Sequence, residues 1–182
     1  MRISSILAVT PFPVAIVAVW AFVIVPWQCS HVKRQSEDVI LSFERMANPS
    51  PAAIAKSRDI SVRVRRCILC MPNDLDLRFE AAASSLVLGA NDAAVDQYRE
   101  ALKIDRRPEI YLNLGTALYN SGRRQEATVA FARLYAFTSF MVNYDPDVPW
   151  SGERVLDLVP SELREQVIRL AERDRALLGH RR

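Results

Sequence analysis

The sequence predicts an all-α protein: a single transmembrane helix, then a short solenoid of helical hairpins with two clear repeats and one degenerate repeat, then a C-terminal capping helix. Two observations predict this arrangement. A long apolar segment lies near the N-terminus, and one helix-turn-helix pattern occurs twice between Leu75 and Phe137. A fixed period over several matched positions is typical of repeat architectures. The matched pairs, each 33 positions apart, are Gly89 and Gly122, Ala94 and Ala127, and Tyr98 and Phe131.

The N-terminal segment, residues 1–30, is predicted to be an uncleaved membrane anchor. Ile6 to Trp27 carries no charged side chain and would span roughly 33 Å as a helix, enough for a hydrocarbon core of about 30 Å. A cleaved signal peptide or a lipoprotein signal needs small residues before its cut, and Val25 to Gln28 supplies none. A helix that begins only at Pro13 would leave about 15 residues and a marginal span. We therefore expect contact with the membrane through residues 6–27.

The charges around this anchor leave its orientation open. Arg2 stands before it, and His31, Lys33 and Arg34 stand after it, which leans slightly toward a cytosolic domain by the positive-inside rule. N-terminal anchors with short leading tails usually export the domain that they carry. We therefore expect a single-pass inner (plasma) membrane protein with a periplasmic domain. The net charge of +3, spread among acidic neighbours, predicts no nucleic-acid partner.

Residues 36–73 are predicted to form the degenerate hairpin. Its first helix runs from Ser36 to Met46, and its second covers Pro51 to Cys70, after a run of Pro and Ser that breaks the chain. The alternation of apolar residues over 60–64 also fits a strand, but helical spacing accounts for more of the apolar positions. The extra hairpin matters physically, because about three repeats are needed before a stack buries its own faces.

Residues 74–137 are predicted to hold the two clear repeats. Their helices are expected at Asp74 to Leu88, Asp92 to Ile104, Pro108 to Asn120 and Arg124 to Phe137. Gly115 allows the neighbouring helix to approach closely. Residues 138–182 come next as a linker, expected to pack over the last repeat, with a short helix at 151–158 and a capping helix that begins at Ser161. The apolar face of that last helix caps the stack or, alternatively, docks a partner.

This pattern resembles the tetratricopeptide repeat (TPR), through its period, Gly115 inside a first helix, the two turn glycines, and the alanine and aromatic residue that come after each turn. The resemblance covers residues 67–137 well and residues 36–73 loosely. It implies a non-catalytic scaffold or adaptor for protein–protein interaction, in a setting such as a bacterial envelope or polysaccharide-export assembly. It also implies a concave groove, lined by the first helix of each hairpin, that binds a protein or peptide partner.

The match to this family's groove positions defines a candidate partner-binding site. Its residues are Asp76, Phe79, Ala83, Leu86, Glu109, Leu112, Asn113, Thr116, Tyr119 and Asn120. Some family members hold a C-terminal carboxylate with Lys, Arg and Asn; here Asn113 fits, but Phe79 and Leu112 stand where Lys is needed. An apolar groove edged by Asp76, Glu80 and Glu109 better suits an amphipathic segment with basic flanks. The alternative is that the chain's own C-terminal region covers the groove.

Residues that carry catalysis or bind metals are sparse in this sequence. Cys67 and Cys70 lie at the C-terminal end of a predicted helix, where the helix dipole opposes a thiolate. We expect packing thiols there, with a structural disulfide as the alternative, and Cys29 as a thiol beside the anchor. The two histidines, His31 and His180, lie at opposite ends of the chain.

No enzyme activity, cofactor, metal or small-molecule substrate is therefore predicted. An alternative function is a small structural subunit of a membrane complex, bound through its anchor and its last helix. A remoter alternative is an accessory domain of an enzyme.

Overall fold

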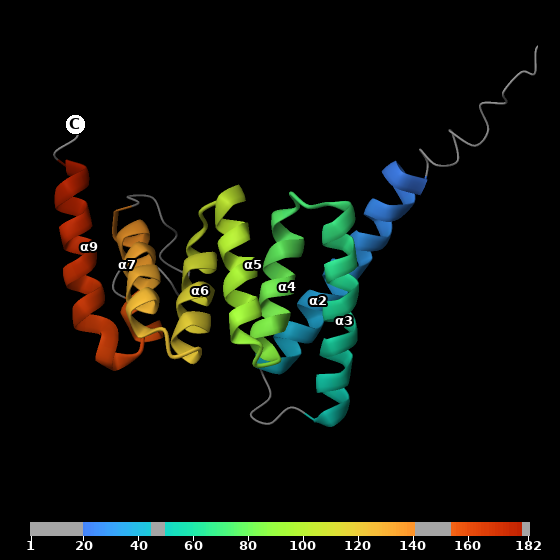
Figure 1. The fold of residues 1–182 in the computed structure, drawn as a ribbon, viewed down its shortest axis with the longest axis horizontal. Helices are drawn as coiled ribbons and strands as arrows, with labels where there is room; N and C mark the ends of the chain where they lie inside the picture. Colours follow the sequence, from blue (N-terminus) through green and yellow to red (C-terminus); the bar gives the residue numbers. More distant parts are fainter. Residues whose placement is uncertain (1–19, 45–49, 141–153, 180–182) are drawn as a thin grey trace, which may run out of the picture.

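The computed structural model describes residues 20–44, 50–140 and 154–179, which form helices joined by turns, with no strand among them (Figure 1). In chain order these are η1 (Trp20–Ile24, a π-helix), α2 (Val25–Glu44), α3 (Pro51–Cys70), α4 (Leu75–Val87), α5 (Asn91–Ile104), α6 (Pro108–Asn120), α7 (Arg124–Phe140), α8 (Val155–Leu158), η3 (Ser161–Leu163, a 3-10 helix) and α9 (Arg164–Gly179).

The helices pair into hairpins that stack in one row, α2 with α3, α4 with α5, and α6 with α7, and α9 closes the row against α7 (Figure 1). The first helices of successive hairpins also meet, α2 with α4 and α4 with α6. Contacts between neighbouring hairpins are the pattern of a helical solenoid. The described part of the chain is therefore consistent with a TPR-like stack of hairpins.

The predicted membrane anchor is not supported by this structure. Among the residues it describes, no helix is long and apolar enough to cross a membrane. The fold class predicted with a transmembrane helix is therefore wrong in that element, and so is the single-pass inner-membrane location. Residues 1–19, the larger part of the predicted anchor, lie outside the described residues. Its last part, Trp20 to Trp27, forms η1 and the start of α2.

The physical reason lies in the apolar stripe of α2. Its buried residues recur at intervals of three and four, which places them on one helix face. That face packs against α3 and α4 in a common core with Ile60, Val64 and Leu77. The first helix of this hairpin therefore begins at Val25, well before the predicted start at Ser36, although Trp20, Val23 and Trp27 stay exposed. The buried α2 residues are Val25, Cys29, Val32, Ser36 and Val39.

The helices after α2 begin and end close to the predicted positions. The bounds of α3 confirm the predicted helix from Pro51 to Cys70, so the alternative of a strand at 60–64 is wrong. The Ser50 hydroxyl caps this helix by accepting from the backbone N–H of Ala53 at 3.2 Å. The Asp74 carboxylate caps α4 in the same way. The linker expected to pack over the last repeat falls largely at residues 141–153, outside the described ranges.

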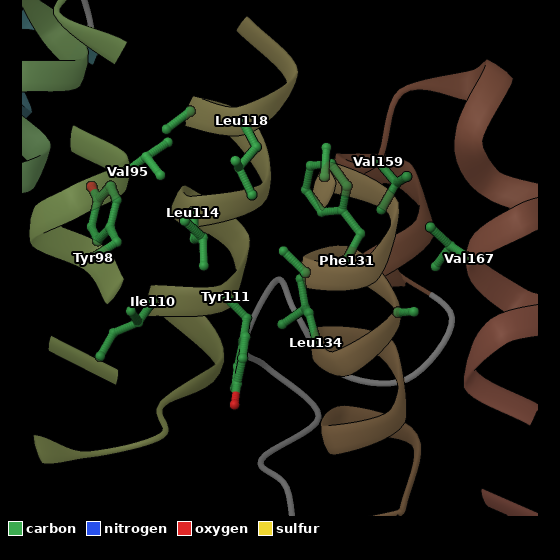
Figure 2. Packing of buried hydrophobic residues seen from close by; sticks show 14 of the residues in the cluster. Val95, Tyr98, Ile110, Tyr111, Leu114, Leu118, Phe131, Leu134, Val159 and Val167 are labelled. Carbon is green, nitrogen blue, oxygen red and sulfur yellow. The ribbon is translucent and has the colours of Figure 1, made fainter. Parts of the chain in front are cut away.

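The main core runs through α5, α6, α7 and α9 (Figure 2). Gly115 of α6 faces the ring of Phe131, where a Cβ atom would meet ring carbons at 2.6–2.8 Å. Figure 2 shows Phe131 of α7 between α6 and the segment that carries Val159 and Val167. The apolar face of the last helix, with Val167 and Ala171 buried, is thus occupied by the chain itself.

Candidate partner-binding face

The predicted groove residues come from α4 and α6, and they fall into two groups. On α4, Ala83 is buried, and Phe79 packs edge-on against Tyr98 of α5 with ring centroids 5.8 Å apart. On α6, Leu112 and Tyr119 are half-buried against the core, whereas Asn120 is exposed. The remaining predicted residues, Asp76, Leu86, Glu109, Asn113 and Thr116, are half-buried.

Helix α2 forms a wall of this face that the sequence reasoning missed. Lys33 forms an ion pair with Asp76, and the Ser36 hydroxyl lies 3.4 Å from that of Ser84. These contacts lay α2 beside α4, where the first helix of the preceding hairpin belongs in a solenoid. The spacing of the buried α2 residues was the available signal, but the uncharged apolar run favoured an anchor.

At the other end of the face, the C-terminal region touches α6. The Tyr119 hydroxyl donates a hydrogen bond to the Glu162 carboxylate of η3. The bond and the negative charge of Glu162 raise the pKa of Tyr119 above its ordinary value. The chain's own C-terminal region therefore reaches the Tyr119 end of the predicted groove.

A pocket of about 280 Å³ lies between α2, α4 and α6, and we call it the three-helix pocket. It brings together predicted residues Asp76, Phe79 and Glu109, but not those toward the ends of α4 and α6. Its apolar wall comes from α4 and α6, and its charged residues come from α2, α4 and the start of α6. The lining residues are Lys33, Glu37, Leu75, Asp76, Phe79, Glu80, Arg107, Glu109 and Ile110.

The pKa of the Glu80 carboxyl is strongly raised in this pocket. The residue is only 6% exposed, and burial raises its pKa from 4.5 to about 7. The nearby Ser36 hydroxyl and Lys33 oppose this shift, while Glu37 and Asp76 add to it. At neutral pH the carboxyl is therefore divided between its neutral and its ionised form.

This shift makes the stability of the protein depend on pH. Because the pKa of Glu80 is higher in the folded than in the unfolded state, the folded protein binds more protons between about pH 4.5 and about pH 7. The free energy of unfolding is expected to fall as pH rises through that window. Urea denaturation of Glu80→Gln at about pH 5 and about pH 8 should show a smaller fall than the wild type. Glu100→Gln, at an exposed ion pair, should keep the wild-type fall; equal falls in all three proteins would contradict the assignment.

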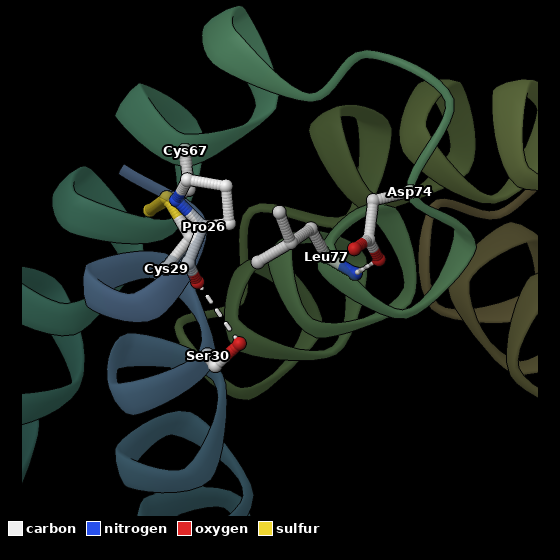
Figure 3. The surroundings of a disulfide bond; sticks show 6 residues. All are labelled: Pro26, Cys29, Ser30, Cys67, Asp74 and Leu77. Atoms are coloured by element: carbon white, nitrogen blue, oxygen red, sulfur yellow. Dashed lines mark hydrogen bonds between the residues drawn. A yellow bond between two sulfur atoms is a disulfide. The ribbon is translucent and has the colours of Figure 1, made fainter. Parts of the chain in front are cut away.

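The cysteines pair differently from the prediction. Cys29 of α2 and Cys67 of α3 form a disulfide, with Cα atoms 5.5 Å apart (Figure 3). Cys70 is a free, exposed thiol. Cys67 is therefore not a packing thiol and Cys29 is not a thiol beside an anchor. The two cysteines pair because α2 and α3 lie side by side. The prediction of an anchor had placed Cys29 at the end of a membrane segment instead.

Among the described residues, no group of three or more His, Cys, Asp or Glu side chains is placed to hold a metal ion. His31 stacks on Trp27 with ring centroids 6.5 Å apart and contacts Gln35 through a ring nitrogen at 3.0 Å. These contacts lie on α2, away from the three-helix pocket.

Comparison with known proteins supports the TPR resemblance over part of the chain. No protein-family model and no solved structure matches it. The chain is 31% identical over 99 residues to the "Small glutamine-rich tetratricopeptide repeat-containing protein 2" of Mycosarcoma maydis, a match that covers 53% of this chain and 28% of that protein. The chain is thus similar to a TPR protein and spans less than a third of its length. Neither this relative nor the structure supports a membrane, a bacterial envelope or an export assembly as the setting.

Proposed function

We propose that this chain is a non-catalytic, TPR-like scaffold that binds a segment of a protein partner on the face formed by α2, α4 and α6. The observation that carries the proposal is the three-helix pocket, which lies where the first helices of successive hairpins meet. The similarity to a TPR protein points to the same class of function.

The size and lining of the pocket suit part of a larger ligand. Small-molecule sites usually enclose about 300–1,000 Å³, and this pocket, at about 280 Å³, is comparable with the smallest of them. It suits one or two side chains of a larger ligand whose backbone lies across the neighbouring helices. Leu75, Phe79 and Ile110 supply apolar contact area, and the charged residues around them fix the orientation of the bound segment.

The alternative of a structural subunit has less support. It required contacts from the anchor and from the apolar face of the last helix. That face packs on α7, with Val167 and Ala171 buried. The alternative of an enzyme accessory domain has no observation that favours it.

Selection of peptides from a displayed random library against the full chain tests this proposal. Peptides should be recovered, and in NMR titrations they should shift backbone amides at residues 75–80 and 107–110. Thr116→Arg should weaken their binding by about tenfold or more, since residue 116 lies two turns beyond Glu109 on the same face of α6. Within the described ranges, the Thr116 hydroxyl donates only to the Leu112 carbonyl of its own helix, at 3.0 Å, so the fold should persist.

Gln125→Arg is the matched control, because it introduces the same charged side chain at an exposed position of α7, away from the face. It should bind the peptides as the wild type does. Recovery of no peptide, or equal affinity for Thr116→Arg and wild type, would contradict the proposed function.

A further inference from the structure

The three-helix pocket holds more negative than positive side chains. Four carboxylates line it, from Glu37, Asp76, Glu80 and Glu109, and two cations, from Lys33 and Arg107. Both cations are directed to the same acid. Lys33 pairs with Asp76, and Arg107 reaches Asp76 at 3.5 Å while it also binds Asp105 at 2.9 Å. Asp76 is therefore paired with both cations, whereas neither cation forms an ion pair with Glu80 or Glu109 among the described residues.

Two carboxylate oxygens of this pocket lack a hydrogen-bond donor. The Oε2 atoms of Glu80 and Glu109 are buried, and neither has a partner among the described residues. Glu80 as a residue is only 6% exposed, and it lines the pocket from its α4 side. An unpaired buried acceptor costs about 1–3 kcal/mol, and more when it is charged. Because both residues line the empty volume, their incompletely paired carboxylates mark a place where a ligand's donor would be stabilised.

We infer that this pocket binds the side chain of a lysine or arginine on the protein partner, with the cationic N–H groups donating to Glu80 and Glu109. This inference rests on the proposed function and names the chemistry of its partner. The apolar wall of Leu75, Phe79 and Ile110 suits the methylene stem of such a side chain. Its ammonium or guanidinium supplies three or five donors and no acceptor, which matches a site made of acceptors.

A metal ion fits this site less well. Metal sites need several ligands converging on one point at about 2.0–2.6 Å, and the described residues contain no such group of carboxylates. Long, branched donors on an organic cation can instead reach two acids that lie on different helices. Arginine matches best, because its planar fork presents two edges of donors.

Binding of the cation should depend on pH through Glu80. The charged or titratable groups around it are Lys33 and Glu37 from α2, Asp76 from α4, Tyr98 from α5, and Arg107 and Glu109 at the start of α6. Burial raises the pKa of Glu80 to about 7, so below that pH the acid is mostly neutral and attracts a cation weakly. The affinity should therefore rise about tenfold between about pH 6 and about pH 8.

A titration with N-acetyl-arginine amide, followed by backbone-amide NMR of the full chain up to about 20 mM, tests the inference. N-acetyl-citrulline amide, which has the same shape and no charge, is the matched probe. The arginine probe should shift amides at residues 76–80 and 107–110 at about pH 8, and the citrulline probe should not. Glu80→Gln and Glu109→Gln should each weaken the arginine response by about tenfold, and Glu100→Gln should leave it unchanged.

Several results would overturn the inference. These are no shift with the arginine probe, equal shifts with citrulline, or an unchanged response in both pocket variants. Far-UV circular dichroism checks folding, and if Glu80→Gln is unfolded, Glu109→Gln and the pH series decide. The library selection separates the two proposals: peptides that bind this face without Lys or Arg refute the cation site alone, whereas recovery of no peptide refutes the proposed function.

Discussion

Replacing Cys29 by alanine is expected to lower the free energy of unfolding by about 4 kcal/mol under non-reducing conditions. The disulfide closes a loop with a sequence separation of 38 residues, and a cross-link of that length removes about this much conformational freedom from the unfolded chain. Both partners are nearly buried, Cys29 at 3% and Cys67 at 7% exposure, so the bond lies within the α2–α3 core. Urea denaturation of the variant and the wild type measures the difference.

The chain offers its own control for this prediction. Cys70→Ala should unfold like the wild type, because that thiol is free and exposed. Cys67→Ala should match Cys29→Ala, and adding a reductant should bring the wild type to the same level. A wild type that unfolds identically with and without reductant would contradict the disulfide. The bond also matters for the pocket, because it holds α2, which supplies Lys33 and Glu37 to its lining.

Gly115→Ala is expected to destabilise the protein by about 3 kcal/mol, the upper end of the usual cost of overpacking. Alanine is the better helix former by about 1 kcal/mol, so propensity alone predicts the opposite sign. Packing decides here, because the new Cβ would lie 2.6 Å from a ring carbon of Phe131, which is itself 1% exposed and has no room to move away. Thermal and urea unfolding of the variant give the sign directly.

A double-mutant cycle identifies the cause of this loss. Phe131→Leu removes the ring that the Cβ meets, so Gly115→Ala should cost much less in that background, with a coupling energy of about 1 kcal/mol or more. Asn120→Ala, at an exposed position of the same helix, should change stability little. If Gly115→Ala stabilises the protein, or costs the same with and without Phe131, the close approach of α6 and α7 is not its cause.

The repeat pattern predicted the central helices well because their signals are local. Pro108 at the start of α6, the glycines at positive φ that end α4 and α6, and the caps at Ser50 and Asp74 each act within a few residues. The matched alanines and aromatics then set which faces pack. Tyr98 and Phe131 are both buried, as repeat positions that fill a core should be.

Predictions from local signals failed where the structure of a segment depends on residues far away in the sequence. At the described end of the uncharged apolar run, Trp20 and Trp27 are exposed and Val25 is buried, and only the position of α3 and α4 beside α2 shows that this helix belongs to a hairpin. The same neighbours explain Cys29, whose partner is separated from it by most of a hairpin. The packing of α2 and the disulfide could not be predicted from local signals, because both depend on residues far apart in the sequence.

For the candidate face, too, some features could be predicted from the sequence and others required the structure. Family positions indicated Asp76, Phe79 and Glu109, all of which line the three-helix pocket. The wall from α2 was missed, because it comes from a segment outside the two clear repeats. The contact of Glu162 with Tyr119 agrees with the alternative that the chain's own C-terminal region reaches the groove. The raised pKa of Glu80 also required the structure, since it arises from burial, which depends on how the helices pack.

By itself, the sequence determined the repeat period, the helices from Pro51 onward and their turns, because propensity, capping and helical spacing depend on residues close together in the sequence. Only the tertiary structure decided that residues 25–35 also belong to the first helix of the stack, that Cys29 joins Cys67, and that four carboxylates gather between three helices. These features arise from contacts between residues far apart in the chain, and burial and charge at such contacts are properties of the packed molecule.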